Sequence, residues 1–239
     1  MTNALNLGDV TLPGEMYPSL FGFSIPVTLG LEGAYLFGEG ANQFAFNYAV
    51  DKPDATVVGV PAAGAGFATF SETGYLDTGI SETADMTIIT VCRDFTGTAD
   101  PVPAFVGNHL NVNLGGVAIF HNSTGTQAQA QSVKAGASDV ASVALANGYS
   151  WSMLAHRPKN NAPSLLANLT TGASGSSPSS GARSIYAAPL LIGRIPNNSY
   201  KGLNDQVACL IYSRALSDAE LAQVAVWLRS YCTSKSIVA

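Results

Sequence analysis

Apolar and polar residues alternate along several short segments of the chain, as they do in β-strands with one buried face. Residues 86–93 (MTIITVCR) and 207–212 (VACLIY) show the pattern most clearly. Turn-forming residues interrupt such segments roughly every eight to twelve residues, which is the spacing expected of an antiparallel sandwich. Further strands are predicted at residues 104–106, 116–120, 140–145, 150–155, 164–168 and 189–195.

One helix is predicted, and it follows the last strand. Ser217 and Glu220 have the spacing of a capping box, in which each residue satisfies a backbone N–H of the other at the start of a helix. Apolar residues then recur at helical spacing, so one face of the helix should pack against the sandwich. These residues are Leu221, Val224, Ala225, Leu228 and Tyr231, and Trp227 and Cys232 border them as further packing residues.

The first 30 residues have a different character. Pro13, Pro18 and Pro26 lie among apolar residues, and proline disfavours both a helix and a central strand. Residues 1–30 are therefore predicted to form an extended arm that covers either its own sandwich, the favoured alternative, or a neighbouring subunit. Residues 31–239 are predicted to form the sandwich domain with its C-terminal helix.

Residues 202–231 resemble the closing segment of a known fold family. A glycine, an alternating strand, an aromatic-x-Arg-x-Leu turn and a Ser-x-x-Glu helix start occur there in order. This order resembles the laminin-G-like branch of the concanavalin A-like lectin/glucanase superfamily. The segment 35–79, which ends in YLDTG, resembles the opening of that family. The resemblance implies an all-β fold, a two-sheet antiparallel jelly-roll β-sandwich, in which residues 124–138 and 170–184 are expected to be variable loops.

The charge of the chain excludes some partners. Charged residues make up 11% of the sequence and the formal net charge is −5, whereas soluble domains average roughly 25% charged residues. The scattered lysines and arginines argue against nucleic acid, which needs clustered basic groups. No apolar run approaches the roughly 20 residues of a membrane span, so no membrane partner is expected. The first residues also lack the basic and apolar regions of an export signal.

The cysteines indicate a reducing compartment. Cys92, Cys209 and Cys232 are odd in number and far apart. Buried free thiols are therefore favoured over a disulfide framework or a metal site. Synthesis and folding in a cytoplasm follow from this reading.

No catalytic, metal or cofactor site is predicted. Glycosidases of this architecture place paired acids on alternating positions of one strand, and no strand here has that pattern. Three pairs of nearby acids are read as turn residues instead: Glu82 with Asp85, Asp51 with Asp54, and Glu72 with Asp77. The three histidines accompany no nucleophile motif, and no metal-binding motif is present.

Ligand binding is the chemistry that remains. Carbohydrate sites combine aromatic faces with amide or guanidinium groups, and residues 109–113, 156–161 and 196–201 contain that mixture, although asparagine-rich segments are also common in plain turns. The candidate ligand-binding residues are His109, Asn111, His156, Arg157, Asn160, Asn161 and Tyr200.

These observations predict a non-catalytic, lectin-like binding module. Low charge, free thiols and the missing export signal indicate a protein made in a cytoplasm and displayed after assembly, as a bacteriophage virion or tail surface protein is. Its expected partner is host carbohydrate or another virion protein, and a homo-oligomer is expected through the arm. Two alternatives stay open: a polysaccharide-degrading glycosidase or lyase of the same fold, and a purely structural decoration or assembly protein.

Overall fold

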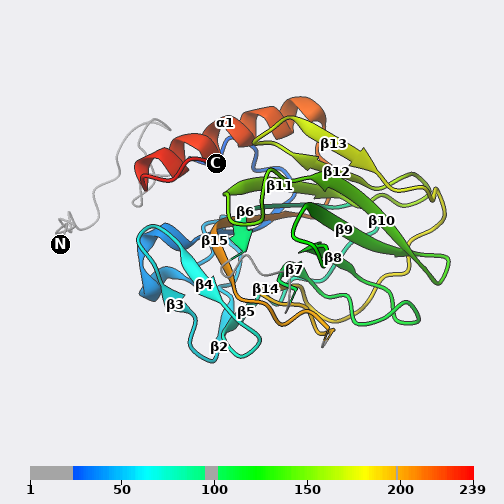
Figure 1. The fold of residues 1–239 in the computed structure, drawn as a ribbon, viewed down its shortest axis with the longest axis horizontal. Helices are drawn as coiled ribbons and strands as arrows, with labels where there is room; N and C mark the ends of the chain where they lie inside the picture. The colour runs from blue at the N-terminus through cyan, green and yellow to red at the C-terminus, as the bar shows by residue number, and fades with distance from the viewer. Residues whose placement is uncertain (1–23, 95–101, 198) are drawn as a thin grey trace.

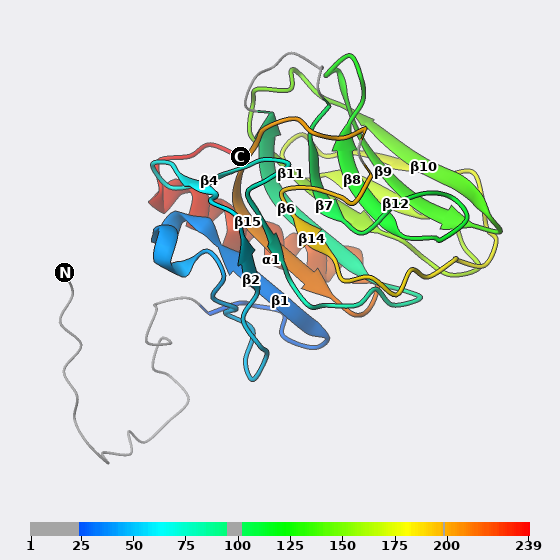
Figure 2. The ribbon, with the colours of Figure 1, turned by 90° about the horizontal axis from the view of Figure 1, so that it is seen from below.

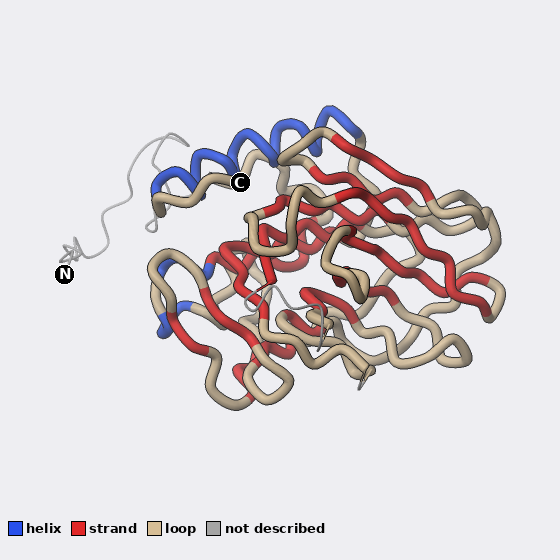
Figure 3. Tube along the Cα trace, viewed as in Figure 1, coloured by secondary structure: helices blue, strands red, loops and turns tan. Residues whose placement is uncertain are grey.

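Two antiparallel β-sheets stack face to face, and one α-helix lies across the outer side of one sheet (Figure 1). The computed structural model describes residues 24–94, 102–197 and 199–239. Strands dominate these residues, and α1 is the one α-helix among them (Figure 3). The predicted all-β jelly-roll sandwich with a C-terminal helix is confirmed. Most of the predicted arm, residues 1–23, lies outside the described part of the chain.

The first sheet, sheet A, has the strand order β13-β12-β11-β6-β15-β4-β3, with β1 also paired to β15. The central strand β15 pairs with β4 through residues 204–206 and with β1 through residues 208–212. Its other edge pairs with β6 along its whole length. The strands are β1 (Leu31–Leu36), β3 (Ala62–Ala63), β4 (Ala68–Phe70), β6 (Thr87–Asp94), β11 (Ser152–Arg157), β12 (Leu165–Asn168), β13 (Ala173–Ser176) and β15 (Asn204–Tyr212).

The second sheet, sheet B, has the order β10-β9-β8-β7-β14-β5-β2. Its longest strands, β9 and β10, form a hairpin at one edge. Two short 3₁₀ helices, η1 (Phe37–Glu39) and η2 (Ala41–Gln43), follow β1. The strands of sheet B are β2 (Thr56–Val58), β5 (Tyr75–Asp77), β7 (Ala104–Gly107), β8 (Val117–His121), β9 (Gln127–Lys134), β10 (Ala137–Ala144) and β14 (Leu191–Ile192).

Sheet A is buried on both faces. Its inner side chains join those of sheet B in the main core, where Ile88, Leu154 and Ile211 face Ile119 and Val143. Its outer side chains form a second apolar cluster beneath α1 (Asp218–Ser234). The predicted helix face is confirmed, because the buried residues of α1 are Leu221, Val224, Ala225, Leu228, Tyr231 and Cys232.

The start of α1 is capped as the sequence predicts. The Ser217 side chain accepts a hydrogen bond from the Glu220 backbone N–H, and Glu220 Oε2 accepts one from the Ser217 N–H at 2.8 Å. Just upstream, Arg214 forms an ion pair with Glu220. The capping box and this ion pair together fix the turn that joins β15 to the helix.

Residues 24–30 run along the apolar cluster beneath α1. Val27 is buried and Ile25 is half-buried there. The Tyr212 hydroxyl donates to the Val27 carbonyl at 3.2 Å, and Arg214 donates to the Leu29 carbonyl. The last residues of the predicted arm therefore contact their own sandwich.

Two predicted loops contain strands, and those predictions are wrong. Residues 124–138 include β9, and residues 170–184 include β13. Small side chains in both segments obscure the alternation of apolar and polar residues that marks a strand. At this edge of the sandwich, β13 of sheet A lies close to β10 of sheet B. A Cβ atom added at Gly175 on β13 would lie 2.2 Å from the Ser142 carbonyl oxygen on β10, so bulky strand-forming residues cannot fit between these strands. The prediction for the cysteines is confirmed: all three are buried free thiols.

Candidate functional site

The outer face of sheet B lies on the side of the sandwich that α1 does not cover. Figure 2 is seen from that side and shows β7 to β10 at the upper right. Along β9, Ala128 and Ala130 point into the core. Because side chains alternate along a strand, Gln127, Gln129 and Gln131 point outward, and they form a row of amide groups.

The glutamines hydrogen-bond to serines on the neighbouring strand β10. Gln129 stands opposite Ser142 in the strand register, and its Nε2 donates to Ser142 Oγ at 3.3 Å. Gln131 Nε2 donates to Ser138 Oγ at 2.8 Å. The β9–β10 hairpin therefore places carboxamides and hydroxyls side by side: Gln127 and Ser138 are exposed, Gln129 and Ser142 are half-buried, and Gln131 is buried.

His109 extends this set from the loop after β7. Its Nε2 lies 3.1 Å from Gln131 Nε2, and an amide N–H can only donate, so His109 Nε2 accepts. The ring proton then sits on Nδ1, where it donates to the Gly115 carbonyl at 3.3 Å. Burial lowers the pKa of His109, and the Gly115 hydrogen bond opposes this only in part. The imidazole is therefore neutral at physiological pH.

An aromatic pair borders the amides. Phe120 on β8 stands opposite Gln129 in the register. The Tyr200 ring packs edge-on against Phe120 with 4.8 Å between the ring centroids. Phe120 is buried and Tyr200 is half-buried, so Tyr200 is the accessible ring of the two. Burial also raises the pKa of Tyr200, which keeps its hydroxyl protonated.

Two loops predicted as binding loops meet beside this face. Asn197 Nδ2 donates to the Leu110 carbonyl at 3.1 Å, which joins the loop after β14 to the loop after β7. Asn111 Oδ1 accepts from the backbone N–H groups of Asn113 and Leu114, so Asn111 shapes its own turn. We call the assembled surface the glutamine face, and it consists of His109, Phe120, Gln127, Gln129, Gln131, Ser138, Ser142 and Tyr200.

The structure places the other four candidate residues elsewhere. His156 lies on β11 of sheet A and is fully buried, and neither ring nitrogen has a hydrogen-bond partner among the residues that the structure describes. Burial, with the nearby charges of Arg183 and Lys134, lowers its pKa to about 3. A ligand outside the folded domain cannot reach this ring.

Arg157, Asn160 and Asn161 have structural partners at the same end of sheet A. Arg157 donates to the Leu216 carbonyl and pairs with Asp218. Asn160 Oδ1 accepts from the Arg183 backbone N–H. Asn161 has a left-handed backbone with φ of 52°, which asparagine tolerates in turns. Of the seven candidates, His109 and Tyr200 belong to the glutamine face, with Asn111 in the loop beside it.

The charged groups of the β9–β10 hairpin point away from the glutamine face. Lys134 and Asp139 are buried inside the sandwich and form an ion pair of 2.9 Å. Lys134 Nζ also donates to the carbonyls of Ala162 and Ser179. Asp139 accepts from the Ser177 hydroxyl and from the Ser179 N–H. This network ties the hairpin to residues 162–179.

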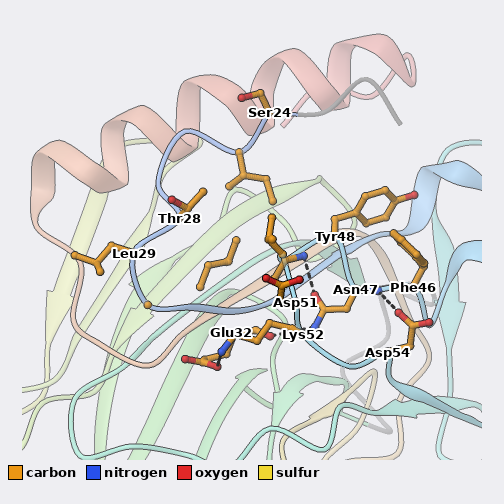
Figure 4. A pocket seen from close by; sticks show the side chains of 15 residues that line it. Ser24, Thr28, Leu29, Glu32, Phe46, Asn47, Tyr48, Asp51, Lys52 and Asp54 are labelled. Carbon is orange, nitrogen blue, oxygen red and sulfur yellow. Dashed lines mark hydrogen bonds and ion pairs between the residues drawn. The ribbon is translucent and has the colours of Figure 1, made fainter. Parts of the chain in front are cut away.

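A separate hollow of about 940 Å³ lies between residues 24–32 and residues 46–54 (Figure 4). Asn47 organises its wall. The Asn47 side chain accepts from the N–H groups of Ala34 and Ala49 and donates to the carbonyls of Glu32 and Pro53.

Other polar groups of this hollow also have internal partners. Glu32 pairs with Lys52 at 2.6 Å and accepts from Ser213. Asp54 accepts from the Asn47 N–H at 2.8 Å. The polar groups here thus hold their own loop in place; those of the glutamine face also bond to one another, but Gln127, Gln129 and Ser138 lie on the outer side of a sheet.

Two buried acids have basic partners within the fold. Glu82 is buried, pairs with Arg183 at 2.8 Å, and accepts from the Tyr186 N–H. Asp205 is buried and pairs with Arg93. Within residues 24–94, 102–197 and 199–239, no three His, Cys, Asp or Glu side chains gather as metal ligands would. None of the described helices is long and apolar enough to cross a membrane.

The sequence matches no protein-family model and no curated protein. Solved structures share its fold. Domain 4 of AbnA, a GH43 extracellular arabinanase from Geobacillus stearothermophilus solved with arabinotriose, superposes with a TM-score of 0.61 at 13% identity, over 83% of this chain and 100% of that domain. The binding domain of Paraclostridial Mosquitocidal Protein 1 gives 0.62 at 13% identity, and a botulinum neurotoxin type C structure gives 0.60 at 8%.

The extent of these matches differs. Each toxin match covers 84% of this chain, which spans about half of the toxin chains. The arabinanase domain is matched over its whole length. At these identities the likeness establishes the two-sheet sandwich fold.

Proposed function

We propose that this chain is a carbohydrate-binding module and that its ligand lies on the glutamine face. The observation that carries the proposal is the geometry of the β9–β10 hairpin, which displays Gln129, Ser138 and Ser142 on the same face as the Tyr200 ring, with Gln131 buried beneath Ser138. Amides and hydroxyls bind sugar hydroxyl groups, and an aromatic ring packs on the apolar face of a sugar.

The similar solved structures support this proposal. The arabinanase domain was solved with an arabinotriose bound, and the type C neurotoxin is described as depending on two ganglioside molecules. The arabinanase domain is the stronger support of the two, because its whole length superposes on this chain, whereas only about half of the toxin chain does. The corresponding role here is non-catalytic attachment to a glycan.

The experiment is a binding screen on a glycan array, followed by affinity electrophoresis with the polysaccharides that score. Gln129→Ala removes one amide of the face and should weaken binding about 2–10-fold, because one net hydrogen bond is worth about 0.5–1.5 kcal/mol. Gln223→Ala is the matched control, since Gln223 is exposed on α1, over the outer side of sheet A. Equal weakening in both variants, or no glycan bound by the full chain, would overturn the proposal.

We further propose that the chain is displayed on a bacteriophage virion or tail after cytoplasmic synthesis, as a homo-oligomer. Its 11% of charged residues and its buried free thiols support this setting. Mass spectrometry of purified particles tests the location, and light scattering of the full chain tests the oligomer. Absence from particles overturns the first part, and a monomer at micromolar concentration overturns the second.

A further inference from the structure

The charges around the glutamine face point to a particular class of ligand. We infer that the face binds uncharged glycans and disfavours acidic ones; this inference rests on the proposed carbohydrate-binding function. The residues that form the face include no Asp, Glu, Lys or Arg, and His109 is buried in its neutral form, with Nε2 accepting a hydrogen bond from Gln131. Cationic side chains strengthen the binding of acidic polysaccharides, and the residues that form this face supply none.

The lysines closest to the face along the chain both have acidic partners. Lys134 ends β9, but its side chain is buried and bound to Asp139. Lys201 follows Tyr200 in the chain, and it is paired with Glu72 at 3.0 Å. Lys134 is thus neutralised inside the fold, and the charge of the exposed Lys201 is balanced by the neighbouring Glu72, so neither pair adds net positive charge beside the face.

The direction of the hydrogen bonds supports the same conclusion. The two N–H groups of Gln131 are taken by His109 and Ser138, and one N–H of Gln129 is directed at Ser142. The Oε1 atoms of both glutamines accept no hydrogen bond from the part of the chain that the structure describes. Carbonyl oxygens accept from sugar hydroxyls but repel carboxylate and sulfate oxygens. Ser138 and Ser142 each accept an amide N–H and can donate their own proton, which suits hydroxyl groups that both donate and accept.

The length of the face favours a chain over a single sugar. Alternate residues of a strand are about 6.7 Å apart, so the row from Gln127 to Gln131 extends for about 13 Å. That length exceeds one pyranose ring. The inferred ligand is therefore a neutral oligosaccharide or polysaccharide segment.

Affinity electrophoresis of the full chain tests this inference with paired polysaccharides. Neutral arabinan, xylan and β-glucan are compared with polygalacturonate, alginate and sialylated glycans, each at 50 mM and 500 mM NaCl. We expect binding to at least one neutral polymer that changes less than about twofold with salt, because no ion pair is formed for salt to screen. Gln129→Ala should weaken that binding, and Gln223→Ala should leave it unchanged.

The outcomes separate the two claims. Stronger binding to an acidic polymer, with an affinity that falls steeply with salt, would overturn the inference and leave carbohydrate binding intact. Binding to neither set would overturn carbohydrate binding itself. A neutral glycan whose binding is weakened equally by both variants would overturn the assignment of the glutamine face.

Discussion

Replacement of Asp139 by asparagine should destabilise the hairpin that carries the glutamine face. Asp139 and Lys134 are both buried and lie 2.9 Å apart. Asp139→Asn keeps the shape of the side chain but leaves the Lys134 ammonium without its counter-charge in the sandwich interior. Removal of one partner of a buried ion pair costs about 3–5 kcal/mol. Because Lys134 keeps two carbonyl acceptors, we expect a loss near the lower end, about 3 kcal/mol.

The assay is urea unfolding at pH 7, followed by fluorescence, with Asp218→Asn as the matched control. Asp218 pairs with Arg157, but its side chain is 89% exposed. An exposed pair contributes at most about 1 kcal/mol, so the control should lose less than that. A loss below about 1 kcal/mol for Asp139→Asn, or equal losses in the two variants, would refute the reasoning.

The lowered pKa of Asp139 also predicts how the stability of the fold changes at acidic pH. Burial alone would raise the pKa of Asp139, but hydrogen bonds from Ser177, Lys134 and Ser179 and the charge of Lys134 together lower it. A carboxyl whose pKa is lower in the folded state contributes stability that is complete above its ordinary value of 3.8 and is lost as the pH falls through the lowered value. At pH 7 the Asp139 carboxyl is therefore ionised, and the unfolding experiment measures the ion pair alone.

Three further predictions concern positions elsewhere in the fold. Gly175→Ala should cost about 1–3 kcal/mol, because its Cβ would lie 2.2 Å from the Ser142 carbonyl oxygen; thermal unfolding at or above the wild-type midpoint would contradict this. Asn47→Ala should cost about 2–4 kcal/mol, because four backbone groups lose their partner; urea unfolding measures it, and a loss under about 1 kcal/mol would contradict it. His156 has a folded pKa lowered to about 3 from 6.5, so the unfolded chain binds the proton first and stability falls as the pH drops below 6.5. Between pH 7 and pH 5 this histidine should cost about 2 kcal/mol; His156→Leu should lose that part of the pH dependence, and an unchanged dependence would count against it.

The sequence predicted the parts of the fold that large side chains define. Bulky apolar residues alternate with other residues along strands such as β6 and β15. The spacing of Ser217 and Glu220 predicts the cap of α1. β9 was missed because three of its inward residues, Ala128, Ala130 and Ser132, are small and look like loop residues. The reason is three-dimensional: the closeness of β13 to β10 limits side-chain size, and no local pattern reveals that distance.

The candidate site was predictable to a similar extent. Aromatic and histidine content predicted Tyr200 and His109 as candidates, and both lie on the proposed face. Gln127, Gln129 and Gln131 alternate strictly with small residues, and this two-residue period is the sequence pattern that would have predicted the strand β9. His156 has the composition of a binding residue, but its burial depends on the strand to which it belongs. Composition alone does not distinguish an inward position from an outward one.

A crystal structure of the full chain with its best-binding neutral oligosaccharide would test the central claim most directly. We predict sugar hydroxyls within hydrogen-bonding distance of Gln129 and Ser142, with a sugar ring against Tyr200. Sugar bound instead in the hollow between residues 24–32 and 46–54, with the glutamine face empty, would contradict the proposal.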